Sequence, residues 1–220
     1  MSSSEINKIN QKLITAVVAE KIRNAINKYE LLPGQRIGEQ EISELLNVSR
    51  TPVREAFRTL EAEGYLTHNP RCGVIVTVLN RDDIINIFDI RSHLEQLMVE
   101  KTALHISEDE LAKLNAIGER MKAVSNDELD EETFRLLDEE IHDVLAANCG
   151  NSKLEELTKN LKNSTKLVRS RAGFSVSRAV ESLSESIQLI QAINRKDCEA
   201  ASKVMKIHFD KSLEFFLSSL

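Results

Sequence analysis

The chain has 220 residues, of which 41% are hydrophobic, and a formal net charge of −6. This length suits one small and one medium domain with real hydrophobic cores. No apolar run approaches the roughly 18 residues of a membrane-spanning helix, and the N-terminus lacks a basic-then-apolar signal, so we expect a cytoplasmic protein without a membrane partner. Three scattered cysteines, never in CxxC spacing, argue against a disulfide framework or a zinc finger.

The first third of the chain is expected to contain three helices. Apolar residues recur at helical spacing over residues 11–30 and predict the first one. The stripe expected to be buried is Ile14, Val17, Val18, Ile22, Ala25 and Ile26. Two shorter helices are predicted at about 39–46 and 50–63, joined by the tight turn Asn47-Val48-Ser49.

The third predicted helix has two distinct faces. Its apolar face consists of Val53, Ala56, Phe57 and Leu60, at the spacing that packs on a core. Its polar face carries Arg50, Thr51, Arg54 and Arg58. Two helices joined by a tight turn, with cations at the start of the second, are typical of a helix-turn-helix DNA reader. The extended run over 73–79 suits one strand of a β-wing.

These residues carry a family resemblance. The run Val48-Ser49-Arg50-Thr51-Pro52-Val53-Arg54-Glu55-Ala56, continued by Leu60-Glu61-Ala62-Glu63-Gly64-Tyr65-Leu66, resembles the winged helix-turn-helix domain of GntR-type bacterial regulators. The upstream Leu32-Pro33-Gly34-Gln35-Arg36-Ile37 also matches, and the resemblance covers roughly the first third of the chain. It implies a sequence-specific DNA-binding protein that acts as a homodimer on a palindromic operator.

The polar face then provides candidate DNA contacts. Arg50 and Arg54 are four residues apart on one face, and one or both are expected to contact bases, because Arg can bond guanine O6 and N7 together. Thr51, and Ser49 if its hydroxyl is not used in capping, suit phosphate or base-edge bonds, and Arg58 suits a phosphate. The remaining candidates lie in the turn before the reader and at the wing tip: Arg36, Arg71 and Gly73. Lone surface arginines are usually only solvated, but three at i, i+4 and i+8 within this motif favour DNA.

Beyond the wing the chain reads as almost uninterrupted helix. Six helices are expected, at about 82–104, 107–124, 129–148, 152–171, 176–195 and 197–218. Residues 1–79 hold ten Lys and Arg against nine Asp and Glu, and residues 80–220 hold 19 against 26, so the acidic second part is expected to face away from DNA. The prediction is a mainly α protein. A winged helix-turn-helix domain of three helices and a small β-wing occupies 1–79, and an all-α bundle of about six helices occupies 80–220.

Three looser phrases in the second part resemble the FCD-type ligand-binding domain of the fatty-acid-regulator (FadR) subfamily. They are Arg91-x-x-Leu94-Glu95, Asp138-x3-His142 leading to Asn148-Cys149-Gly150-Asn151, and the closing Ala192-Ile193-x3-Asp197 with Ala201 and His208. The resemblance implies an effector-binding and dimerisation domain. The whole chain is then expected to be an effector-responsive transcription factor, with repression as the expected sign.

Asp138, His142 and His208 are candidate ligands for a divalent transition metal. A carboxylate and two imidazoles converging inside a bundle suit zinc or nickel, although an Asp–His pair beside an unrelated core histidine would give the same spacing. Many FCD domains bind a metal through one Asp and three His, and the resemblance places these three residues at ligand positions and Ser186 at the fourth. A hydroxyl is a poor ligand for such metals. The site therefore has three protein ligands with water or effector completing it, or it is weakened, or it is vestigial. Glu185 is adjacent but points about 100° away around the helix.

Arg91 falls on the apolar stripe of its helix, and an inward guanidinium needs a partner. Glu95, one turn on, can satisfy it. The resemblance favours a second role, in which Arg91 binds the carboxylate of a small effector such as a sugar acid or hydroxy acid. Arg178, near the break at Gly173, is expected to be solvated.

Two other functions stay open. A helical metal-dependent enzyme could be fused to a DNA reader, but no general base is separable from the candidate ligands, and no phosphate loop or nucleophile motif occurs, so we do not expect an enzyme. The other is a metal-free DNA-binding regulator without an effector, which the missing fourth ligand supports.

Overall fold

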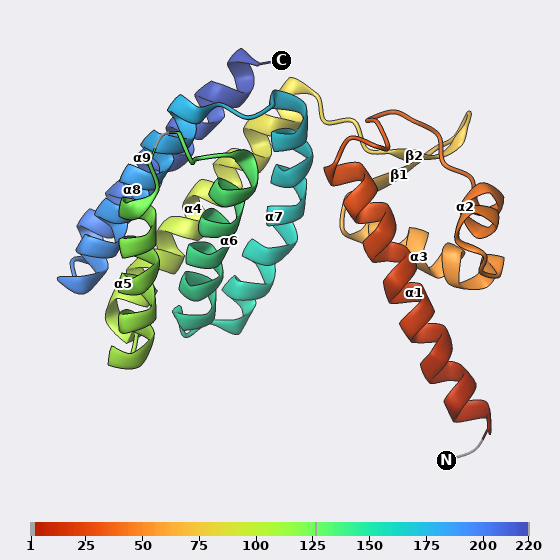
Figure 1. The fold of residues 1–220 in the computed structure, drawn as a ribbon, viewed down its shortest axis with the longest axis horizontal. Coiled ribbons are helices and arrows are strands. Elements are labelled where there is room, and N and C mark those ends of the chain that lie inside the picture. The colour runs from red at the N-terminus through yellow and green to blue at the C-terminus, as the bar shows by residue number, and fades with distance from the viewer. Residues whose placement is uncertain (1–2, 126, 220) are drawn as a thin grey trace. The chain divides into compact units, whose positions relative to one another are not determined.

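The protein is described by a computed structural model that covers residues 3–125 and 127–219. The N-terminal elements are α1 (Ser3–Asn27), α2 (Glu39–Leu46), α3 (Arg50–Ala62), β1 (Leu66–Asn69) and β2 (Gly73–Val76). They are followed by α4 (Arg81–His105), α5 (Glu108–Ala123), α6 (Glu131–Asn148), α7 (Ser152–Ala172), α8 (Val176–Asn194) and α9 (Cys198–Ser218), as Figure 1 shows. The predicted class, mainly α with one small wing, is confirmed.

The chain divides into two compact units. The first takes the chain as far as Asn80 and adds the short segment Asn163–Ser170 of α7, and the second contains Arg81–Lys162 and the chain from Arg171 onward. Within the described residues, no helix is both long enough and apolar enough to cross a membrane.

The first unit is built around α3. Both α1 and α2 pack against this helix, and β1 follows it directly. Val53, Phe57 and Leu60 of α3 are buried in the core of the unit. β1 and β2 form an antiparallel hairpin in which Leu66 pairs with Val76. Gly64 has φ +82, the left-handed backbone that glycine adopts most easily, and so ends α3.

The buried stripe predicted for α1 is wrong at its N-terminal end. Ile14 and Val17 are 41% and 55% exposed, whereas Val18, Ile22 and Ile26 are buried. The reason is the length of the helix: it begins at Ser3, and its 25 residues extend for about 37 Å. In Figure 1 the N-terminal end of α1 extends past α2 and α3.

The second unit is a helical bundle in which α4 packs against α9, α6 and α8. Phe88 of α4 meets the rings of Phe209 and Phe216 of α9 at 5.9 and 5.5 Å between centroids. The Ser107 side chain accepts a hydrogen bond from the Glu110 N–H at 3.3 Å and so caps α5. Both α4 and α8 pack against α6 and against α9, and this packing brings one face of α6 close to one face of α9.

Candidate DNA-reading face and metal centre

The exposed face of α3 carries the predicted reader residues. Arg50, Thr51, Arg54 and Arg58 are exposed, opposite the buried stripe of the same helix. Ser49 stands at the N-cap position with extended backbone, but its side chain makes no capping hydrogen bond. Its hydroxyl is therefore not used in capping and remains a candidate for a DNA contact. The contacts themselves stay a prediction.

Two of these arginines are held by carboxylates. Arg54 binds Glu39 of α2, with Nε 3.0 Å from Oε1 and Nη2 2.9 Å from Oε2. Arg58 binds Glu55 on its own helix at 2.9 Å. The hydrogen bond from Arg54, together with the charges of the neighbouring reader arginines, lowers the pKa of Glu39.

The other predicted DNA contacts lie in the wing or alongside it. Arg71 is exposed in the turn between the strands, where its N–H donates to Asn69 Oδ1 at 2.9 Å. Gly73 has φ +87, and no atom lies within 4 Å of the position that a Cβ would take. Arg36 is exposed and forms an isolated bridge with Ile75, which brings it alongside β2.

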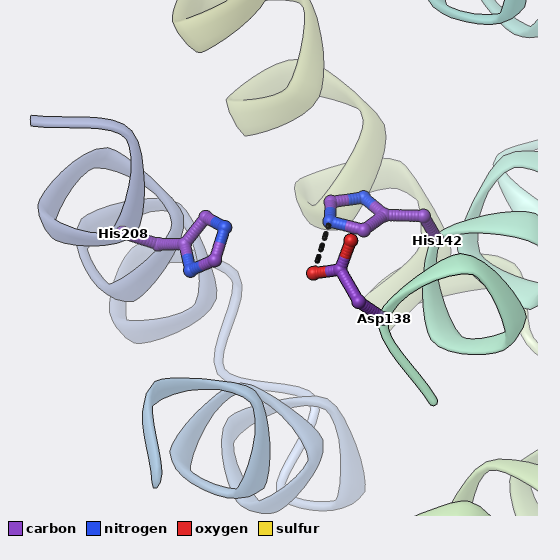
Figure 2. A group of neighbouring side chains, drawn as sticks. All are labelled: Asp138, His142 and His208. Atoms are coloured by element: carbon purple, nitrogen blue, oxygen red, sulfur yellow. Dashed lines mark ion pairs between the residues drawn. The ribbon is translucent and has the colours of Figure 1, made fainter. Parts of the chain in front are cut away.

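The second candidate site lies inside the helical unit. Asp138 and His142 of α6 and His208 of α9 point toward one another in Figure 2, and their candidate ligand atoms all lie within 4.8 Å of one another. His142 Nε2 is 3.9 Å from Asp138 Oδ1. The side chains of the two histidines are only 13% and 12% exposed. The structure therefore brings together the three residues that the sequence singled out.

Each histidine has a carboxylate behind it. His142 Nδ1 lies 2.8 Å from Oε2 of Glu95 on α4, and His208 Nδ1 lies 2.9 Å from Oε2 of Glu185 on α8. The contact of His208 is a hydrogen bond, which fixes the tautomer and leaves Nε2 to face the site, whereas the contact of His142 is an ion pair without hydrogen-bond geometry. Neither Glu95 nor Glu185 was predicted from the sequence as a partner of these histidines.

An arginine stands behind each carboxylate. Arg91 forms a buried ion pair with Glu95, and Arg178 holds Glu185 through two contacts of 3.2 and 2.8 Å. Burial alone would raise the pKa of both carboxyls. The charges of Arg91 and His142 overcome it and hold the pKa of Glu95 at about 2. Hydrogen bonds from His208 and Arg178 do the same for Glu185, also at about 2.

Arg178 corrects one expectation, and Glu185 has a role that was not expected. Arg178 is not simply solvated: its side chain is largely buried, and besides Glu185 it reaches Ser212 Oγ at 3.1 Å. Glu185 does lie one step around α8 from Ser186, but the packing of α8 on α9 places its carboxylate on His208. The sequence around Glu185 gives no local sign of this role, because its neighbours are Ser184 and Ser186.

The pairing of Arg91 with Glu95 accounts for its burial without an effector. Its guanidinium also lies over the Phe209 ring, 4.9 Å from the centroid. The local partner considered in the sequence analysis is therefore present, and the effector-binding role of Arg91 stays a prediction.

Ser186, at the predicted fourth-ligand position, lines a small cavity of about 10 Å³ together with His142 and His208. That space holds about one water molecule. The donor set fits a transition ion: one carboxylate and two imidazoles, with both Nδ1 atoms already occupied by carboxylates. Three protein ligands with adjacent space resemble an open metal site rather than a closed structural one.

Comparisons with known proteins identify the two domains in which these candidate sites lie. The family model for bacterial regulatory proteins of the gntR family matches residues 14–76, and the FCD domain model matches residues 86–211. YdhC of Bacillus subtilis, named as an uncharacterized HTH-type transcriptional regulator, is 33% identical over 83% of this chain and 81% of its own. The Nta operon transcriptional regulator of Aminobacter aminovorans is 30% identical over 84% of this chain and 88% of its own.

Solved structures agree as well. A protein from Rhodococcus sp. RHA1 described as a GntR transcriptional regulator has a TM-score of 0.75 and 25% identity, and the match covers 94% of this chain and 98% of that one. Escherichia coli McbR/YncC has a TM-score of 0.78 at 19% identity, covering 93% and 97%, and so shares the fold. These relatives are named as regulators rather than enzymes. The chain belongs to the GntR family of bacterial transcriptional regulators, with an N-terminal helix-turn-helix domain and a C-terminal FCD domain.

Proposed function

We propose that this regulator is a homodimeric repressor that binds a palindromic operator, and that its operator affinity is set by a small carboxylate held at a metal centre in the FCD domain. The observation that carries the regulatory half is the convergence of Asp138, His142 and His208, with each imidazole turned into the site by a carboxylate. The DNA-binding half rests on the exposed cationic face of α3.

In this proposal Arg50 and Arg54 read base edges, and the other reader and wing residues contact phosphates or base edges: Arg36, Ser49, Thr51, Arg58, Arg71 and Gly73. The test uses a duplex that the wild-type protein selects from a random-sequence pool, beside an unselected duplex. Arg54→Ala should cost about 1–3 kcal/mol on the selected duplex and less on the unselected one. An equal loss on both would make Arg54 a phosphate contact.

An apolar stripe on α4 supports the homodimer. Ile90, Leu97 and Leu104 are 52%, 40% and 60% exposed and lie at intervals of seven residues. Seven residues fall only about 20° short of two full turns, so the three side chains form a nearly straight line along the outside of the helix. A two-fold dimer buries the same patch of both copies. The same two-fold symmetry places the two reader helices on the two halves of a palindromic operator.

Asp138, His142 and His208 would hold the ion, and zinc or nickel suits this combination of imidazole and carboxylate. The ion would supply a Lewis acid to which a carboxylate oxygen of the effector binds. Glu95 and Glu185 hold the two rings in place, and Arg91 and Arg178 neutralise those carboxylates within the bundle.

The space beside the centre limits the size of an effector. A second cavity of about 20 Å³ is lined by the cations Arg91, Lys159 and Lys162 and by the acids Glu95 and Asp143, together with His142. A space of this size holds water rather than a sugar acid or hydroxy acid, so such a ligand requires side chains or helices to move. Movement of this kind lets the ligand favour one arrangement of the protein over another, which is what allosteric control requires.

The experiment is a panel of small carboxylates, each added with zinc to the wild-type protein and to His142→Ala. The expected result is that at least one carboxylate changes the affinity for the selected duplex in the wild type and has no effect in the variant. Equal effects on the two proteins would place the effector elsewhere, and no effect from any carboxylate would remove that class of ligand.

A metal-free regulator without an effector is the second candidate, and one observation favours it. Both histidines already have carboxylate partners, and both carboxylates have arginine partners, so the network balances much of its own charge without an ion. Metal content separates the two candidates.

A further inference from the structure

The ion pair between Arg54 and Glu39 differs from the other contacts of the reader helix. It joins two helices: Glu39 is the first residue of α2, and Arg54 lies in the second turn of α3. Both carboxylate oxygens take part, at 3.0 and 3.2 Å from Nε and 2.9 Å from Nη2. Arg58, by contrast, binds only a neighbour on its own helix. Among the side chains that the structure describes, Arg50 forms no hydrogen bond or ion pair.

General DNA affinity does not explain Glu39 at this place, and helix stability explains its charge at the N-terminus of α2 but not its contact with Arg54. Exposed ion pairs contribute little to folding, typically well under 1 kcal/mol. A negative charge beside three arginines of a DNA-facing surface also repels phosphate, and so weakens binding to any sequence. The lowered pKa of Glu39, caused first by the hydrogen bond from Arg54, shows that this charge is held within the cationic face.

The geometry instead suits the positioning of Arg54. The guanidinium is a planar fork with five N–H donors, and Glu39 occupies its Nε–Nη2 edge. The opposite edge, with the N–H groups of Nη1 and one of Nη2, remains for an acceptor pair such as guanine O6 and N7. A long, exposed side chain that is already oriented loses less rotamer freedom when it binds.

We propose that Glu39 is a specificity-determining residue, which orients Arg54 for bidentate recognition of a base and reduces its attraction to unspecific phosphate. The inference rests on the proposed base contact of Arg54. It predicts that removing the charge of Glu39 strengthens unspecific binding and at the same time lowers discrimination between sequences.

The test compares Glu39→Gln with the wild type on the duplex selected by the wild-type protein and on an unselected duplex. The unselected duplex should bind roughly two- to fivefold more tightly to the variant, because one repulsive charge is gone. The ratio of selected to unselected affinity should fall by about tenfold, within the range that one bidentate base contact provides. Thermal unfolding should be nearly unchanged, since the pair is exposed.

Glu55→Gln is the matched control, because it removes the same charge from the same face and releases Arg58 rather than Arg54. It should strengthen binding to both duplexes alike and keep their ratio. In an Arg54→Ala background, Glu39→Gln should leave the ratio unchanged. A wild-type ratio in Glu39→Gln, or an equal fall in Glu55→Gln, overturns the role of Glu39 while leaving DNA recognition intact. A wild-type protein that selects no sequence would overturn the proposed function itself.

Discussion

His208 on α9 is joined to Glu185 on α8 by a hydrogen bond of 2.9 Å between Nδ1 and Oε2. Burial by itself would raise the pKa of Glu185, but His208 and Arg178 hold this pKa at about 2. The carboxylate is therefore ionised and accepts a hydrogen bond from the N–H of His208 Nδ1. The Nε2 of His208 is then the nitrogen available to the site. The position of a ring on one helix is therefore fixed by a residue on another.

Replacing this carboxylate should weaken the metal centre without removing a ligand. We expect Glu185→Gln to lower zinc affinity by roughly 10- to 100-fold, as the loss of an outer partner of a ligating histidine typically does. Competition against a chromophoric chelator measures it. Glu199→Gln, which alters an exposed acid in the first turn of α9, is the control and should bind zinc like the wild type. Wild-type affinity in Glu185→Gln would show that packing alone positions His208.

A substitution of Ser186 tests the reverse change, in which a ligand is added to the metal centre. Since Ser186 lines the small cavity beside His142 and His208, Ser186→His adds an imidazole at the position predicted from the family resemblance for a fourth ligand. We expect zinc affinity to rise by at least about tenfold, which is about 1.4 kcal/mol. Ser184→His places the same side chain on the exposed side of α8 and should change nothing. No gain from Ser186→His would mean that this position does not face the ligand atoms.

The α4 stripe predicts how the dimer can be broken. Leu97→Lys places a charge at the centre of the proposed interface and, by two-fold symmetry, does so twice. Each buried leucine contributes about 1.5–3 kcal/mol, so dimerisation should weaken by at least about 100-fold. Sedimentation equilibrium measures the change. Leu157→Lys, which alters an exposed leucine of α7, should leave the dimer intact; equal sedimentation of Leu97→Lys and the wild type would place the interface elsewhere.

The buried pair of Arg91 and Glu95 predicts an acid-sensitive contribution to stability. Burial alone would raise the pKa of Glu95, but Arg91 and His142 lower it from 4.5 to about 2. A folded-state pKa below the unfolded one means that the contribution is complete above about pH 4.5 and is lost as the pH falls towards 2. Glu95→Gln should therefore unfold at a lower temperature than the wild type at pH 7, and the difference should shrink below pH 4.5. A difference that is the same at both pH values would show that Glu95 contributes through shape and not charge.

The sequence predicted much of this architecture because the relevant signals are local. Helix periods and the turn Asn47-Val48-Ser49 each act within a few residues, and the helices after the first lie close to their predicted ranges, whereas α1 begins eight residues before its predicted start. Asp138 and His142 share a helix face by spacing alone. Their convergence with His208 followed from a family resemblance, since 66 residues separate His142 from His208 in the sequence.

What the sequence missed depends on contacts between distant helices. The partners of His142 and His208 are carboxylates on α4 and α8, and no local pattern specifies which acid of those helices turns inward. Arg178 looked solvated because its partner Glu185 lies two turns away, where only the packing on α9 buries both. Ile14 shows the reverse error: a helical stripe predicts burial only where a neighbouring element exists to cover it.

The most direct test of the account is the metal content of the purified protein, expressed without a histidine tag and measured by elemental analysis beside His142→Ala. The account predicts about one zinc, nickel or similar ion per chain in the wild type and a loss of that ion in the variant. No metal in the wild type, even after dialysis against a mixture of divalent ions, would contradict it. The Asp138, His142 and His208 cluster would then be a buried polar network, and the protein a DNA-binding regulator that works without metal.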